Sequence, residues 1–468
     1  MAKLDLKITN GTVATAADVF RCDIGVRSGR IVLLGDDLPA AEETIDARGK
    51  LVVPGGIDSH CHMDQQPWEG RTTADDFRSG TISAACGGNT TVIPFAMQVR
   101  GQPLRPIVDD YHERARAKAV IDYAFHIILG DPTPQVMGQE LPALVRDGCT
   151  SIKIFLTFDK LALSDYEVLQ VMAFARREGA MLMIHAENHD CVRWLTEQLL
   201  LSGQTSMKFH GAAHSPISDR EATHRAIALS EIAGVPVLIV HVSAGQVAEQ
   251  IRWAQDRGLQ VYAETCPQYL FLTADHMDTH DMEGAKYVCT PPPRTREDQD
   301  HLWRELKNGT IQVFSSDHSP ICYSEKIRTG PRTAFNKIPN GIPGIETRLP
   351  LLYSEGVGKG RITINQFVAV GATNAAKIYG LYPRKGTIAV GSDADIAIWD
   401  TEREVTITND MLHHNADYTA FEGMKVNGYP VMTISRGEVV WRDGEVLGKP
   451  GRGEFLPCDP PNFPQPLG

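Results

Sequence analysis

From Leu51 to about residue 380, short apolar runs alternate with longer amphipathic stretches, and this alternation limits the fold more than any other feature. Each run has the length of a buried strand, and each connection can hold a helix. We expect strands at Leu51–Asp58, Asn89–Phe95, Tyr123–Leu129, Thr150–Leu156, Ala180–Ala186, Val235–Val242, Leu259–Thr265 and Gln312–Asp317. The pattern predicts an α/β fold, a TIM-like (β/α)8 barrel, with a doubly wound open sheet as the alternative.

Short strands are also expected at both ends of the chain. Turn signals at Asn10-Gly11 and Ser28-Gly29 divide the first ~50 residues. Apolar runs such as Ala394–Trp399 return after the barrel region. Because each set is too short to bury a face alone, we expect 1–53 and 384–446 to form one small β-sandwich domain beside a barrel at 54–383. The proline-rich residues 447–468 predict an extended C-terminal tail, for which a neighbouring subunit is one candidate surface.

Charge and cysteine usage exclude several classes of protein. The chain has 46 basic and 58 acidic residues, a net charge of -12, which argues against nucleic acid or an anionic membrane as the main partner. No apolar run approaches the ~18 residues of a membrane span, and Met1–Asn10 lacks the apolar core of a signal peptide. The nine cysteines are irregularly spaced, several in apolar runs, so we expect free buried thiols and a cytoplasmic location.

Ionisable side chains close several expected barrel strands, at the end where such barrels carry their active sites. They are His60 and His62 after the first strand, Lys153 in the fourth, His185 after the fifth, His241 after the sixth and Asp317 after the eighth. Residues two apart on a strand face one way, so His60 and His62 suit one divalent metal ion, usually zinc. An isolated His-x-His pair is more often a surface turn, but the other strand ends favour a metal site.

Lys153 and Asp317 are the two residues that could supply chemistry beyond simple ligation. Lys153 alternates with isoleucines and should point into the barrel, where burial and nearby cations lower a lysine pKa. A neutral amine can add CO₂ to give a carbamate that bridges metal ions; an ion pair with Asp317 or Glu187 is the alternative. Asp317 could ligate metal and, as the catalytic residue, carry a proton from hydroxide to the leaving nitrogen. A helix N-cap is its alternative role, and His318 is expected to be structural or supporting.

The same residues lie in longer motifs spread over nearly the whole chain. These are Pro54-Gly55-Gly56-Ile57-Asp58-Ser59-His60-Cys61-His62, Ser151-Ile152-Lys153-Ile154-Phe155, His185-Ala186-Glu187-Asn188, His241-Val242-Ser243, Ser316-Asp317-His318, Ile338-Pro339-Asn340-Gly341, Gly344-Ile345-Glu346-Thr347-Arg348 and Lys385-Gly386-Thr387-Ile388. Together they resemble the dihydropyrimidinase and D-hydantoinase group of cyclic amidohydrolases.

This resemblance implies two zinc ions per subunit, bridged by hydroxide and by Lys153 carboxylated to N6-carboxylysine. One ion would be held by His60, His62, Asp317 and the Lys153 carbamate, and the other by the same carbamate with His185 and His241. The implied reaction is hydrolytic ring opening of dihydropyrimidines or 5-substituted hydantoins to N-carbamoyl amino acids. Members of the group usually form homotetramers or homodimers.

Three positions are implied to bind substrate, and one departs from the group. The tyrosine expected five residues after the modified lysine is Phe158, which lacks the hydroxyl that polarises the attacked carbonyl. An imidase or other specialised ring amidase, acting on cyclic imides, is therefore the alternative function. The other two positions are Thr290, before a double proline, and Asn340. Dihydroorotases carry an arginine where this chain has Asp64, and that carboxylate should repel an anionic dihydroorotate-like substrate.

Two other protein classes remain open from the sequence. A scaffold protein on the same fold, as in the collapsin response mediators that resemble this group, would have lost ligands, whereas all six ligand positions are filled here. A mononuclear deaminase on a related barrel would not need Lys153. Ligand completeness and metal stoichiometry therefore discriminate between these classes.

Overall fold

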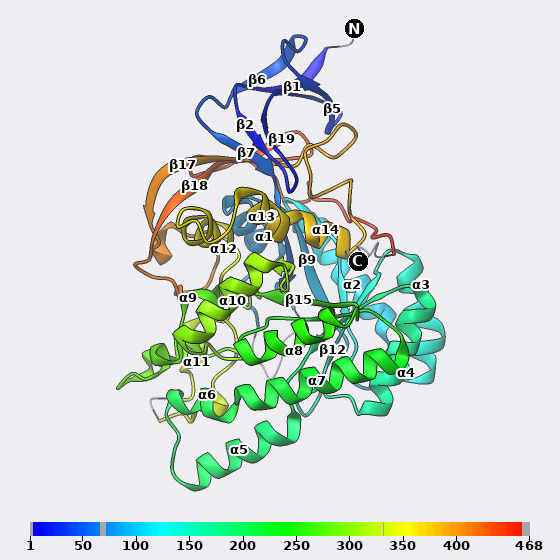
Figure 1. Ribbon diagram of the computed structural model, residues 1–468, viewed down its shortest axis with the longest axis vertical. Coiled ribbons are helices and arrows are strands. Elements are labelled where there is room, and N and C mark those ends of the chain that lie inside the picture. The colour runs from blue at the N-terminus through cyan, green and yellow to red at the C-terminus, as the bar shows by residue number, and fades with distance from the viewer. Residues whose placement is uncertain (1–2, 66–71, 331, 461–468) are drawn as a thin grey trace.

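The computed structural model describes residues 3–65, 72–330 and 332–460, and its centre is a parallel barrel (Figure 1). Its strands are β8 (Gly56–Cys61), β9 (Asn89–Met97), β10 (Asp122–Tyr123), β11 (His126–Ile128), β12 (Ser151–Phe155), β13 (Met181–His185), β14 (Val237–Ile239), β15 (Val261–Thr265) and β16 (Val313–Phe314). β10 and β11 both pair with β9 and share one position in the ring. A parallel bridge between Cys61 and His318 brings the first and last positions together. The predicted (β/α)8 barrel is confirmed, and the open sheet is wrong.

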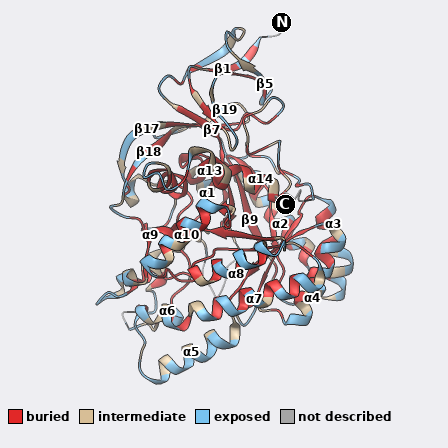
Figure 2. Cartoon of the chain, viewed as in Figure 1, coloured by how far each residue is buried: buried red, intermediate tan, exposed pale blue. Residues whose placement is uncertain are grey.

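Helices cover the outside of this barrel. They are α1 (Phe77–Cys86), α2 (Leu104–Lys118), α3 (Leu141–Arg146), α4 (Asp165–Glu178), α5 (His189–Leu201), α6 (His210–Ala213), α7 (Pro216–Ala233), α8 (Gly245–Asp256), α9 (Pro267–Phe271), α10 (Arg296–Asn308), α11 (Tyr323–Lys326), α12 (Arg348–Leu352), α13 (Ile364–Val368) and α14 (Asn374–Ile378). Local chemistry sets their ends: α4 begins where Ser164 and Glu167 form a capping box and ends at Gly179, with φ 70°. The strands are buried and the outer helix faces exposed (Figure 2).

The first expected strand is in fact two strands that belong to different sheets. β7 (Leu51–Pro54) lies in an outer sheet, and β8 begins the barrel at Gly56. The chain changes sheet at Gly55, where a Cβ atom would lie 2.2 Å from the Thr90 hydroxyl oxygen, so a larger residue does not fit. The prediction of one strand over Leu51–Asp58 was wrong because an unbroken apolar run does not show which sheet buries it.

The strands outside the barrel form two sheets, one N-terminal and one that combines both ends of the chain. The N-terminal strands are β1 (Leu4–Thr9), β2 (Thr12–Ala14), β3 (Val19–Arg21), β4 (Asp23–Arg27), β5 (Arg30–Gly35) and β6 (Ala41–Asp46), and the C-terminal ones are β17 (Ile396–Thr406), β18 (Lys425–Ser435), β19 (Glu438–Arg442) and β20 (Glu445–Val446). One sheet has the order β5-β4-β1-β6, and the other β20-β19-β18-β17-β7-β2-β3. β7 pairs with β17, so the expected union of the two termini forms.

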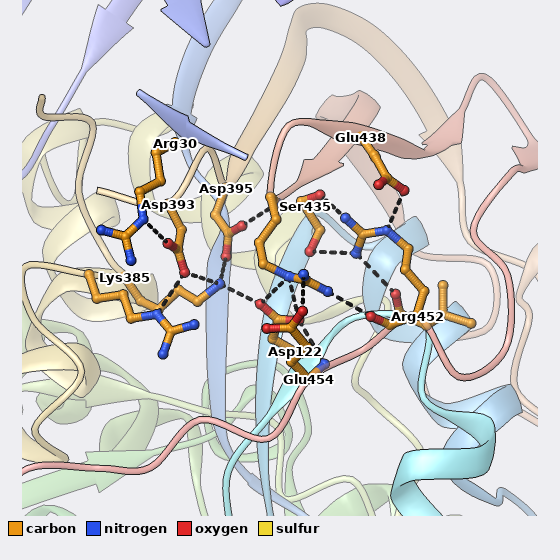
Figure 3. A network of polar contacts seen from close by, with 12 residues as sticks. Arg30, Asp122, Lys385, Asp393, Asp395, Ser435, Glu438, Arg452 and Glu454 are labelled. Carbon is orange, nitrogen blue, oxygen red and sulfur yellow. Dashed lines mark hydrogen bonds and ion pairs between the residues drawn. The ribbon is translucent and has the colours of Figure 1, made fainter. Parts of the chain in front are cut away.

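A buried polar network joins the barrel to these sheets (Figure 3). The Lys385 ammonium donates to Asp122 at 2.7 Å and to Asp395 at 2.6 Å. Asp122 begins β10 in the barrel, and it also accepts from the Arg436 Nε at 3.1 Å, just after β18. Because these groups are buried, opposite charges and hydrogen bonds must balance there. The network therefore fixes the outer sheets against one end of the barrel.

The described part of the C-terminal tail lies along the chain's own barrel. The Tyr123 amide donates to the Glu454 carbonyl at 3.0 Å, and the Leu456 amide donates to the Tyr123 carbonyl at 2.7 Å. Up to residue 460 the tail contacts β10 and also the backbone near Ala119, Gly148 and Gly380 of its own chain. A contact with a neighbouring subunit stays a prediction. The proline-rich end at 461–468 lies outside the described residues, as does the loop at 66–71.

Two further features concern the state of the cysteines and the character of the helices. All nine cysteines are free, and Cys149, Cys266 and Cys289 are buried. In the part of the chain that the structure describes, no helix combines the length and apolar character needed to cross a membrane.

Candidate metal centre

Two histidines at the end of β8 face the middle of the barrel mouth. His60 is fully buried, and its Nδ1 lies 2.5 Å from a carboxylate oxygen of Glu264 on β15. This contact leaves His60 Nε2 free to face the other candidate ligands, which is how carboxylates usually orient metal-binding histidines. Burial lowers the pKa of His62 to about 4, so its imidazole is neutral at ordinary pH and able to bind a metal ion.

Asp317 contacts both of these histidines. One of its carboxylate oxygens lies 3.1 Å from His60 Nε2 and 3.4 Å from His62 Nε2. Burial alone would raise the pKa of Asp317, but the nearby His60 and hydrogen bonds from both histidines hold it well below its usual range. The N-cap alternative fails, because α11 begins at Tyr323 and has Cys322 as its cap. β16 also ends earlier than predicted, at Phe314, and Asp317 has a φ of 47°.

Lys153 reaches the same point from β12. Its buried Nζ lies 2.8 Å from His60 Nε2 and 4.4 Å from the centre of the Phe95 ring. Burial lowers the pKa of Lys153 to about 8, against the smaller attraction of nearby carboxylates. Among the described residues no carboxylate lies within ion-pair distance of Nζ, so the alternative of a pair with Asp317 or Glu187 is not formed. A substantial share of neutral amine is expected near pH 8.

His185 and His241 lie beside this group. Their ring centres are 4.4 Å apart, and the His241 ring is 5.4 Å from that of His60. His185 Nε2 lies 2.6 Å from a carboxylate oxygen of Glu187, which again fixes the ring orientation. His241 Nδ1 is buried with no hydrogen-bond partner among the described residues, and burial holds the pKa of His241 well below its usual range.

The donor set fits divalent metal ions. Ligand atoms of His60, His62 and Asp317 all lie within 4.8 Å of one another. Imidazole nitrogen and carboxylate oxygen are the usual zinc ligands, and His62, with its lowered pKa, need not lose a proton to bind. The unpartnered His241 nitrogen, and a buried Lys153 amine with no carboxylate partner among the described residues, are the features that a metal-free structural role would leave unexplained. The six predicted ligand positions therefore converge at one barrel mouth.

His318 is not part of this ligand group, and its ring holds neighbouring segments together. Its Nε2 lies 3.1 Å from a carboxylate oxygen of Asp75, and its Nδ1 accepts from the Gly344 amide at 3.1 Å. Both ring nitrogens are thus engaged away from the ligand group.

Two of the three expected substrate positions line a cavity of about 900 Å³. Phe158 and Asn340 line the cavity, and the Phe158 ring centre is 5.2 Å from that of His185. Asn340 Oδ1 is buried without a partner among the described residues, so a ligand N–H could reach it. Thr290 is buried beside a cis bond to Pro291, with its hydroxyl 3.5 Å from His210, and is not among the lining residues.

Sequence reasoning missed some residues and misjudged one. Glu264 and Gln65 contact His60 and His62 directly. Glu264 could have been found, because it is a carboxylate near the end of the expected strand Leu259–Thr265. Asp64 was expected to repel an acidic substrate, but it pairs with Lys118 at 2.6 Å and does not line the cavity. Asp64 therefore gives no reason to exclude a carboxylate from the substrate.

Comparisons with known proteins agree with this geometry. Residues 51–440 match the model of the amidohydrolase family. A D-hydantoinase of Geobacillus stearothermophilus is 44% identical over 452 residues, covering 96% of this chain and 95% of that protein. A D-hydantoinase of Ralstonia pickettii is 42% identical over 454 residues, covering 97% and 98%.

Solved structures show the same relationship. The D-hydantoinase of Bacillus sp. AR9 superposes with a TM-score of 0.94 at 44% identity, covering 97% of this chain and 99% of that one. The L-hydantoinase (dihydropyrimidinase) of Arthrobacter aurescens gives a TM-score of 0.89 at 31% identity, covering 97% and 99%. This chain therefore belongs to the amidohydrolase family and, within it, to the group of cyclic amide hydrolases that contains the D-hydantoinases and dihydropyrimidinases.

Proposed function

We propose that this chain is a zinc-dependent hydrolase that opens the ring of dihydropyrimidines or 5-substituted hydantoins to give N-carbamoyl amino acids. The observation that carries the proposal is the convergence of Lys153, with its lowered pKa, on His60 and Asp317 at the barrel mouth. A lysine in that place has no ion-pair partner among the described residues. It is chemically suited to become a carboxylated bridging ligand.

Each predicted ligand has a place in a two-zinc centre. His60, His62 and Asp317 would hold one ion together with the carboxylated Lys153, and His185 and His241 would hold the other with the same group. When bound, such a pair supplies a bridging hydroxide at neutral pH and polarises the ring carbonyl. Glu264 and Glu187 fix the orientation of His60 and His185 from behind.

The chain's own residues account for proton movement and substrate binding. Asp317 is ionised at neutral pH, so its carboxylate oxygen can accept the proton of the attacking water and return it to the leaving ring nitrogen. Asn340 Oδ1 can accept a hydrogen bond from a ring N–H, because it is buried at the cavity wall without a partner among the described residues. Thr290 and its backbone are proposed to bind the same amide edge. Phe158 supplies an apolar wall beside His185.

An imidase is the second candidate function, and Phe158 is the observation that favours it. Without a hydroxyl at this position, a donor that usually assists carbonyl attack is absent. Cyclic imides are more electrophilic than ring amides and depend less on such a donor. Assays of dihydrouracil, substituted hydantoins, succinimide and phthalimide with one zinc-loaded preparation would separate the two functions.

The main test combines metal content with activity. Zinc-loaded protein, supplied with bicarbonate, should hold about two zinc ions per chain and open at least one of these rings. Lys153→Ala should hold fewer ions and lose at least about 10³-fold in kcat, because the bridging ligand is gone. Lys160→Ala, at an exposed site on the cavity rim, serves as the control and should keep its metal. Full metal content and activity in Lys153→Ala would refute the two-zinc proposal.

Location and assembly are also proposals. Free buried thiols suit a reducing compartment, and we assign the chain to the cytoplasm. A homotetramer, or a homodimer, is supported by large apolar side chains left exposed on outer helices. Leu201 is 82% exposed on α5 and Ile232 is 74% exposed on α7. A second copy of the chain would cover them.

A further inference from the structure

The cavity beside the metal centre is larger than a simple ring requires. Its volume of about 900 Å³ lies near the top of the range of about 300–1,000 Å³ for sites that hold drug-sized ligands. At its inner end are Gln65 and Phe158, which contact His62 and His185 respectively. A ring placed at the metal centre would therefore leave most of the cavity to its substituent.

The outer wall of this cavity is polar and carries positive charge. It includes Thr329, Thr333 and Asn336, together with the exposed cations Arg332 and Lys337. Neither of these two side chains forms a hydrogen bond or an ion pair with any residue in the described ranges. Lys160 adds a third cation to the lining. The cavity lining is therefore basic although the whole chain has a net charge of -12.

In the described ranges, no acidic group pairs with Arg332 or Lys337. Among the described lining residues the one carboxylate is Asp159, whose side chain is 87% exposed and lies 3.3 Å from His189. Asp64, the other acidic residue near the centre, pairs with Lys118 and lies outside the lining. The described wall thus has a net positive charge and no partner of its own for Arg332 and Lys337.

We propose that the substrate's ring substituent ends in a carboxylate that binds against Arg332 and Lys337. The inference rests on the proposed function, because it assumes that the ring lies at the metal centre. A guanidinium can take a carboxylate through two parallel hydrogen bonds, and an ammonium adds a flexible point charge. Since both cations are exposed, water screens them, and about a 10-fold preference for an acidic substrate is expected.

The test compares two hydantoins of nearly equal size that differ in charge. 5-(2-Carboxyethyl)hydantoin carries the carboxylate, and 5-(2-carbamoylethyl)hydantoin replaces it with a neutral amide. The zinc-loaded wild-type protein should hydrolyse the acid with a kcat/KM about 10-fold higher, and added salt should reduce this preference. In the double variant Arg332→Gln, Lys337→Gln, KM for the acid should rise about 10-fold while kcat stays within about 2-fold.

A matched control removes a neighbouring cation that does not face the cavity. Arg328 pairs with Glu325 at 3.1 Å and is not a lining residue, so Arg328→Gln should leave both substrates unaffected. Equal use of the two compounds by the wild type, or equal loss on both in the double variant, would overturn the inference.

A binding measurement keeps this result separate from the proposed reaction. If neither compound is hydrolysed, calorimetric titration of the Asp317→Asn protein decides the inference alone, and the proposed function has failed only if the rings of the main assay also stay closed. The inference is supported if this protein binds the acid more tightly than the amide, and if the difference disappears when Arg332→Gln and Lys337→Gln are added to Asp317→Asn. Equal binding of both compounds, or none, rejects it.

Discussion

Glu264 and Glu187 decide which ring nitrogens of two histidines face the metal centre. Each holds one nitrogen, His60 Nδ1 at 2.5 Å and His185 Nε2 at 2.6 Å. A ring held in this way cannot rotate, and its remaining nitrogen gains basicity as a ligand. Both glutamates are fully buried, so removal of either would change the centre without removing any proposed ligand.

Glu264→Gln should weaken zinc binding by about 10-fold, because the amide keeps the hydrogen bond to His60 but loses the negative charge. Competition with a chelator measures the dissociation constant, and metal analysis gives the stoichiometry. Glu283→Gln is the control, since this residue is exposed and contacts Lys286 and Tyr323 rather than any proposed ligand. An unchanged zinc affinity in Glu264→Gln would show that the carboxylate does not act on the metal centre.

Phe158→Tyr tests the most informative departure from the group. The ring already lies 5.2 Å from His185 and lines the cavity, so a hydroxyl at its end would add a donor close to the reacting carbonyl. We expect kcat for a 5-substituted hydantoin to rise about 10-fold, with a smaller change for succinimide. No gain on the hydantoin would indicate that another group already supplies the donor. Phe209→Tyr, on a half-buried ring outside the cavity lining, should change neither rate.

At the scale of elements, the sequence shows which strands form but not how far they extend. The ligands could be predicted to converge, because the carboxyl ends of parallel barrel strands meet at one mouth. β7 and β8 were fused in the prediction, and β16 was too long, because apolar patterning cannot show which sheet buries a residue. The cavity wall at 329–337 has no periodic pattern at all, so its charge became visible only in three dimensions.

Lys385 joins elements of the barrel and the outer sheets, and its loss should destabilise the protein strongly. It contacts Asp122 and Asp395 by hydrogen bonds and Asp393 at 3.1 Å (Figure 3). Lys385→Met would leave buried carboxylates without their shared cation, at a cost of about 3–5 kcal/mol. Urea unfolding of the zinc-loaded protein measures the change.

The control for Lys385 is another cation of the same network. Arg30 lies 3.8 Å from Asp393 and is 60% exposed, so Arg30→Met should cost less than about 1 kcal/mol. A loss below about 1 kcal/mol in Lys385→Met as well would show that other cations, such as Arg436 and Arg384, balance the buried acids and that the network does not depend on Lys385.

At the scale of the whole molecule, we propose three parts: a sandwich domain at 1–53 and 384–446, a barrel at 54–383 and a tail at 447–468. The β7–β17 pairing supports the first, and the contacts of β10 with Glu454 and Leu456 support treating the tail as a strap on the barrel. The six proposed metal ligands all come from the barrel. The outer sheets can therefore affect the site only through contacts such as the Lys385 network.

The exposed apolar side chains of α5 predict where copies of the chain meet. α5 has no buried residue, and two of its large apolar side chains are strongly exposed, Trp194 at 59% and Leu201 at 82%. Figure 2 shows this helix at the outer edge of the molecule. Burying such side chains typically contributes about 1.5–3 kcal/mol each, so a second copy would gain by covering them. Trp194→Glu combined with Leu201→Lys should then yield a smaller species by light scattering. Val390→Glu, 63% exposed outside the barrel, should not change the mass. If the α5 variant kept the wild-type mass, or if the wild type were a monomer, α5 would not be the interface.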